Sequence, residues 1–123
     1  MSGARGEVTF SAGDREVRVL FTNRTIAAAE QKLGKSILAV ARGLTDGTTG
    51  LGETVVLLRE GMEAARRDAN ERGPAVALET AYNVMDIAGF ATIAGAVMEG
   101  VSAVLNWGLA GDEVDDEGDD PNP

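Results

Sequence analysis

The 123-residue sequence contains no cysteine and no histidine. The chain therefore has no thiolate or imidazole nucleophile, no imidazole base, no ordinary zinc site and no disulfide. Aromatic residues are also few, with three Phe, one Tyr and one Trp, whereas glycine occurs 16 times. Small side chains bury little apolar area, so we expect a thin core with helices in close contact. Such a core favours completion by further subunits, and we expect a homo-oligomer.

The N-terminal residues, Met1 to Gly6, contain one arginine and no apolar run. A secretory signal peptide needs such a run, so we expect a cytoplasmic protein. The length fits one domain, which we place at residues 1–110.

Acidic residues concentrate at the C-terminal end of the chain. The net charge is −9, and seven acids lie in the last twelve residues: Asp112, Glu113, Asp115, Asp116, Glu117, Asp119 and Asp120. Without them, 13 acidic residues face 11 basic ones, a net charge of −2. This nearly neutral body lacks the basic stripe that phosphate backbones require, so we expect no nucleic-acid binding. Residues 111–123 are predicted to form a disordered acidic tail.

Apolar residues near the N-terminus alternate and then change to helical spacing. Val17, Val19 and Phe21 repeat at every second residue, and Ser11 to Arg15 supplies a Gly-Asp turn. The pattern predicts a β-hairpin over residues 7–21. Thr22 and Asn23 are candidate caps for the helix that follows.

The remaining sequence predicts helices separated by glycine-rich connections. Residues 44–52 form a flexible connection in this interpretation, and Glu63 pairs with Arg59 and Arg67 on the outer face of the helix that follows. Gly89 bends or breaks the last apolar stretch. We therefore predict an α+β fold: an N-terminal two-stranded antiparallel β-hairpin followed by four to five α-helices, mainly helical, with helices at about 24–33, 36–42, 53–72, 75–88 and 90–107.

The segment Ile87 to Ala110 is apolar enough to suggest a membrane span. However, Thr92, Glu99 and Asn106 belong to a polar stripe at helical spacing, and a charge near the centre of a span costs about 2.5–3.5 kcal/mol. The stripe predicts an amphipathic helix of a soluble protein without a membrane partner. A small membrane-active protein is a remote alternative.

Two short motifs resemble ligand sites, and neither is complete. Gly34-Lys35-Ser36 resembles the end of a phosphate-binding loop, but Ala29 stands where that loop needs glycine. We interpret Gly34 as a helix C-cap and Ser36 as an N-cap. The acidic run from Glu113 imitates a calcium loop that lacks its twelfth ligand. We predict no catalytic residues, no cofactor and no metal site, and therefore no enzyme.

One helix face is a candidate partner-binding groove. Its residues are Val97, Val101, Val104 and Leu105, with Trp107 beside them. Packing in the core would explain the same valines, and both interpretations remain open at the level of sequence.

Residues 5–43 resemble a family of small tail proteins from gene transfer agents and related long-tailed phages. The matching residues are Arg5-Gly6-Glu7-Val8, the hairpin, Val19-x-Phe21-Thr22, and Thr25-Ile26-x-x-x-Glu30-x-x-Leu33-Gly34-x-Ser36-Ile37. Members of the family are described as tail assembly chaperones or as tail tube proteins.

The resemblance implies a non-enzymatic role in tail assembly in the cytoplasm of the bacterial host. Such chaperones bind the tape measure protein and promote assembly of the tail tube, so the tape measure and tail tube proteins are the expected partners. The alternative is a structural tail protein, in the tube or associated with it, that is retained in the tail of the particle.

Overall fold

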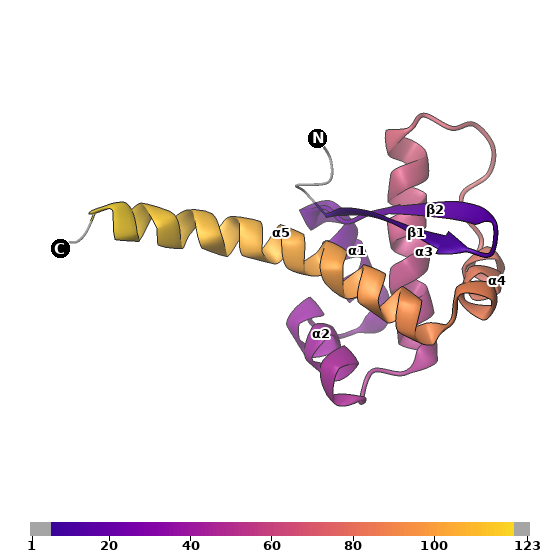
Figure 1. The fold of residues 1–123 in the computed structure, drawn as a ribbon, viewed down its shortest axis with the longest axis horizontal. Helices are drawn as coiled ribbons and strands as arrows, with labels where there is room; N and C mark the ends of the chain where they lie inside the picture. Colours follow the sequence, from indigo (N-terminus) through magenta and orange to yellow (C-terminus); the bar gives the residue numbers. More distant parts are fainter. Residues whose placement is uncertain (1–5, 120–123) are drawn as a thin grey trace.

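A computed structural model describes the backbone of residues 6–119 and the side chains of residues 6–105. It contains one hairpin followed by helices, and it confirms the predicted α+β class (Figure 1). The elements are β1 (Glu7–Ala12), β2 (Arg15–Leu20), α1 (Asn23–Leu33), α2 (Ile37–Asp46), α3 (Leu51–Asp68), α4 (Leu78–Ala88) and α5 (Phe90–Asp119).

The hairpin turns at Gly13 and Asp14, and Gly13 has a φ of 68°. This left-handed conformation suits glycine and a two-residue turn. Val8 pairs with Val19 and Phe10 with Val17, so that the predicted apolar face points toward the core. A lone hairpin is marginal in water. Here β2 packs on α3, and β1 packs on α5.

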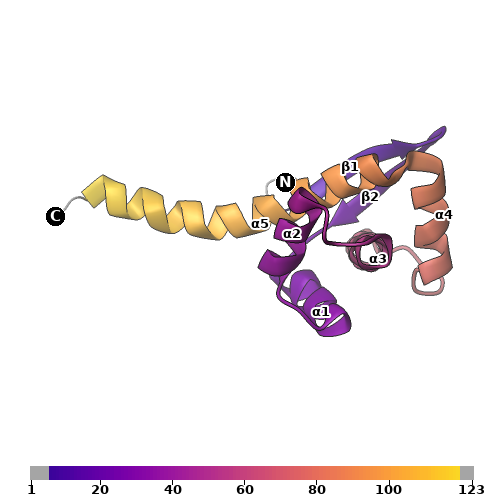
Figure 2. The ribbon, with the colours of Figure 1, turned by 90° about the horizontal axis from the view of Figure 1, so that it is seen from below.

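Helix α3 is the centre of the fold. It contacts β2, α1, α4 and α5, and Figure 2 shows it nearly end-on between the hairpin and α1. Val55, Leu57 and Leu58 are fully buried. The helix was predicted over residues 53–72 but ends at Asp68, and Asn70 then takes a φ of 58°. That left-handed residue cannot continue a helix.

The corner between α1 and α2 has the caps that the sequence predicts. The Thr22 hydroxyl accepts the N–H of Thr25 at 3.1 Å, and Gly34 ends α1 with a φ of 72°. The Ser36 hydroxyl accepts the N–H of Ala39 at 3.2 Å. These interactions confirm that Gly34-Lys35-Ser36 joins two helices.

The connection between α2 and α3 is not the flexible linker that the sequence predicts. Helix α2 continues beyond the predicted end near residue 42 to Asp46, and Gly43 lies inside it. The carbonyl of Gly43 accepts the N–H groups of Thr48 and Thr49 at 2.9 and 3.1 Å. The buried Thr49 hydroxyl donates to the carbonyl of Val40 at 2.9 Å. These bonds hold the connection against α2. A side chain at Gly43 would block this close approach of the connection to the helix.

We expect Thr49→Val to lower the free energy of unfolding by about 1–2 kcal/mol, because the buried carbonyl of Val40 loses its hydroxyl donor. Thr45→Val is the matched control, since the Thr45 hydroxyl makes an exposed and longer bond of 3.4 Å to Ala41. Urea unfolding followed by circular dichroism measures both changes. Equal losses in the two variants would show that the Thr49 bond has no special role.

The fully buried ring of Phe21 lies between the backbones of two helices. A Cβ atom placed on Gly61 of α3 would lie 2.8 Å from Cζ of Phe21, and one on Gly100 of α5 would lie 2.6 Å from Cδ2. The N–H of Phe21 donates to the carbonyl of Gly6 at 3.0 Å, which closes the open end of the hairpin. Phe21 therefore joins the hairpin, α3 and α5 in one contact.

Gly89, with a φ of 92°, separates α4 from α5, and the two helices meet at a bend of 114°. The predicted break is confirmed, although α4 begins at Leu78 and not near residue 75. Helix α5 passes the predicted end near residue 107 and reaches Asp119, extending away from the other elements (Figure 1). Residues 120–123 lie outside the described residues, and disorder of the acidic segment 111–123 stays a prediction.

Candidate interaction surface

Two of the predicted partner-binding residues, Val97 and Val101, belong to the core. Each is 1% exposed. They border a small internal space shared with Ile37 and Val40 of α2 and with Leu57 of α3. The helix face that the sequence presents as a groove is already covered by α2 and α3, so these valines are not available to a partner in this fold.

The other three predicted residues lie further along α5. Val104 and Leu105 are partly buried and pack against the core. The side chain of Trp107 lies outside the described residues. The four residues with described side chains do not form an open groove, because Val97 and Val101 face inward and the helix then leaves the body (Figure 1).

Three large apolar side chains are exposed at the start of α3 and along the first half of α4. Leu51 is 58% exposed, Leu78 is 44% exposed and Tyr82 is 42% exposed. A methyl group on Gly52 would lie 3.8 Å from the Tyr82 hydroxyl, which places Tyr82 beside the start of α3. We call Leu51, Leu78 and Tyr82 the α3–α4 patch. Exposed apolar clusters of this kind are typical of protein–protein contact sites.

The sequence pattern did not reveal the α3–α4 patch. By its spacing, Leu51 belongs to the apolar stripe of α3. It lies in the first turn of that helix, however, where the helices that cover the rest of the stripe leave it exposed. In α4 the buried residues are Ala81, Val84 and Met85. Tyr82 lies on the polar side of that helix. An aromatic residue in such a position is the one feature of the sequence that could have indicated the patch.

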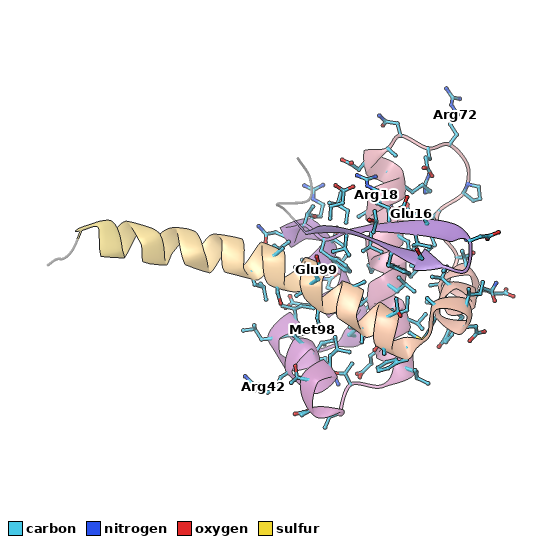
Figure 3. All side chains as sticks on the ribbon, in the orientation of Figure 1. Glu16, Arg18, Arg42, Arg72, Met98 and Glu99 are labelled. Carbon is cyan, nitrogen blue, oxygen red and sulfur yellow. The ribbon has the colours of Figure 1, made fainter. Side chains whose placement is uncertain are left out.

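The hairpin offers a second candidate surface. Within the described residues the sheet has only two strands. Each strand therefore has one edge without a neighbouring strand, and such edges can pair with another chain. Arg18 crosses from β2 toward the C-terminal part of α3, where it donates to the carbonyl of Ala65 at 3.2 Å and to Asp68 at 2.6 Å (Figure 3). It also pairs with Glu7.

A buried carboxylate of α3 fixes the segment that leads into α4. Glu63 is 4% exposed and accepts two hydrogen bonds from Arg66, at 2.9 and 2.7 Å, and one from Arg67 at 2.8 Å. It also accepts the N–H of Val76 at 2.9 Å. The guanidinium of Arg66 is the main cause that holds the pKa of Glu63 far below its usual range.

Glu60, one helical turn earlier, has a similar role. It is 7% exposed and accepts hydrogen bonds from Lys32 of α1 at 2.6 Å and from Arg59 at 2.9 Å. Arg59 in turn donates to the carbonyl of Val76 at 2.7 Å. Val76 is thus held through both its N–H and its carbonyl, which positions α4 and the α3–α4 patch.

The described residues include no group of three or more carboxylate, imidazole or thiol side chains that could hold a metal ion. No single described helix is long and apolar enough to cross a membrane. The bent pair Leu78–Ala88 and Phe90–Leu105 passes that test together, by length and composition only.

Comparisons with family models, with curated proteins and with solved structures give no match for this chain.

Proposed function

We propose that this protein is a tail assembly chaperone of a phage or gene transfer agent, a non-enzymatic protein that binds the tape measure protein in the bacterial cytoplasm and promotes assembly of the tail tube. The tape measure and tail tube proteins are its proposed partners. The family assignment is supported by the resemblance of residues 5–43. The observation that best supports a binding role is the α3–α4 patch.

The patch supports this proposal because it combines exposed apolar area with rigid placement. Leu78 and Tyr82 are one helical turn apart on α4. The start of α4 follows directly after Val76, which Arg59 and Glu63 hold through its backbone. A preorganised apolar surface of this kind is suited to the apolar face of a partner helix.

Co-expression with the tape measure protein of the same gene cluster tests this proposal. We expect the intact chain to raise the soluble yield of the tape measure protein several-fold. The double variant Leu78→Glu with Tyr82→Glu is expected to lose this effect, because two carboxylates would have to be desolvated in the contact.

Asn83→Glu is the control for this experiment, since Asn83 is an exposed polar residue of the same helix. It should retain the effect, and circular dichroism should show that all the variants fold. If the tape measure protein is equally soluble with and without the intact chain, the chaperone function is refuted.

A second candidate is a structural tail protein in the tube or associated with it, and the sheet edges that have no neighbouring strand within the described residues support it. Ring-forming tail subunits join through sheets, and β1 or β2 could extend such a sheet with another chain. Mass spectrometry of purified particles separates the two candidates. A chaperone is absent from finished particles, whereas a structural protein is present in stoichiometric amount.

A further inference from the structure

The charges of this chain are strongly segregated along the sequence. All 11 basic residues lie in residues 1–72, where they face 10 acidic residues. Residues 73–123 contain no lysine or arginine and the other 10 acids. The first part therefore has a net charge of +1 and the second part a net charge of −10. The second part ends in the acidic segment of α5.

Four cations of the first part, Arg24, Lys32, Arg59 and Arg67, line one groove. This groove, with a volume of about 600 Å³, runs between α1, the end of β2 and α3, and we call it the α1 groove. Arg24 is exposed, the side chain of Lys32 is 53% exposed and that of Arg67 is 74% exposed.

The carboxylates of the α1 groove are mostly placed below its cations. The side chain of Glu60 is 8% exposed and that of Glu63 is 5% exposed, whereas Asp68 at the end of α3 is half exposed. A ligand that enters the groove therefore meets cationic groups before it meets most of the carboxylates.

The acidic end of α5 matches this groove in charge and in spacing. Arg24 and Lys32 are about 12 Å apart along α1, given the rise of a helix. Asp112, Asp116 and Asp119 follow one another at spacings of four and three residues and span about 10 Å along the axis of α5.

We propose that the acidic end of α5 binds the α1 groove of a second copy of this chain. Binding within one copy is not favoured, because α5 leads away from the body while α1 lies on the far side of α3 from the hairpin (Figures 1 and 2). The contact joins two different surfaces, so it is heterologous and builds chains or rings of subunits. This proposal does not depend on the proposed chaperone function.

Sedimentation of the full-length protein over a range of concentrations tests the proposal. Association is expected at about 20 mM salt and is expected to be lost at about 500 mM, because the Debye length falls from about 20 Å to about 4 Å. Arg24→Glu should weaken the association constant by about tenfold or more, a change of about 1.4 kcal/mol or more. Arg42→Glu is the matched control, because Arg42 is an exposed cation that points outward from α2, outside the groove (Figure 3).

A charge exchange identifies the two surfaces. One variant carries Arg24→Glu with Ala28→Glu on α1, two residues that line the groove, and it leaves the Lys32–Glu60 ion pair intact. The other carries lysine in place of Asp112, Asp115, Asp116 and Asp119, which gives the last twelve residues a net charge of +1. Each variant alone has like charges on both surfaces and should stay monomeric, whereas their mixture should associate.

Several results would overturn the proposal. A full-length protein that stays monomeric at low salt and high concentration would do so, as would equal association of Arg24→Glu and Arg42→Glu. A mixture of the exchanged variants that does not associate would also exclude the α1 groove as the acceptor. Circular dichroism of every variant shows that each result concerns folded protein.

Discussion

Gly100→Ala is expected to lower the free energy of unfolding by about 2–3 kcal/mol, the range typical of overpacking. The added methyl group would lie 2.6 Å from Cδ2 of Phe21 and 3.1 Å from the carbonyl oxygen of Gly6. The Phe21 ring is fully buried and cannot move aside, because it also contacts Gly61. Urea unfolding followed by circular dichroism measures the loss.

Gly95→Ala on the same helix is the control, with an effect of opposite sign. No atom lies within 4 Å of the position of its added Cβ, so alanine should stabilise the helix by about 0.5–1 kcal/mol. Gly61→Ala and Gly52→Ala provide the same comparison on α3, where Gly61 faces Phe21 and Gly52 has only an ordinary contact with Tyr82. If Gly100→Ala and Gly95→Ala change stability in the same direction, the close contact with Phe21 is not important.

Glu63→Gln is expected to destabilise the protein by about 1.5–3 kcal/mol at neutral pH, because the buried carboxylate loses hydrogen bonds to charged groups. The neutral amide loses the charge-assisted bonds to Arg66 and Arg67 and has one acceptor oxygen in place of two. Glu79→Gln, at an exposed residue of α4, is the control and should change stability little. Thermal and urea unfolding give both values.

The pH dependence gives an independent test of Glu63. Its pKa is lowered in the folded protein, chiefly by Arg66, so below the ordinary glutamate value the unfolded chain binds the proton more readily. The carboxylate therefore makes its full contribution to the free energy of unfolding above an ordinary glutamate pKa of about 4.3. This contribution declines as the pH falls below that value. The difference in free energy of unfolding between the wild type and Glu63→Gln should therefore decrease as the pH falls from about 6 to about 3. A constant difference would show that the ion pair is not the cause.

The corner from Phe21 to Ile37 could be predicted from the sequence because its signals are local. A threonine cap, a left-handed glycine and a serine cap each act within a few residues. Glu30 adds a further local interaction, since it accepts the N–H of Ile37 at 2.8 Å. The hairpin was predictable for the same reason, through its alternating valines and its Gly-Asp turn.

The features that the sequence did not predict depend on contacts between distant residues. Glu63 looks like a member of an exposed ion-pair ladder, yet it is buried because Val76 and its segment fold over it. The Gly- and Thr-rich connection before α3 reads as flexible, yet Thr49 reaches back to Val40. Val97 and Val101 are part of the core, one of the two interpretations that the sequence left open, because α2 and α3 cover their side of α5. None of these pairings leaves a local pattern.

The packing of β1 against α5 has a consequence for synthesis on the ribosome. The hairpin leaves the exit tunnel before α3 and α5, and Gly100 and Val101 are among the last residues of the described body to be translated. At about 5–20 residues per second, α3 can cover β2 within several seconds, whereas the side of β1 that packs on α5 stays uncovered for on the order of ten seconds. Co-translational holdases would have access to the α5-facing side of β1 only during this interval.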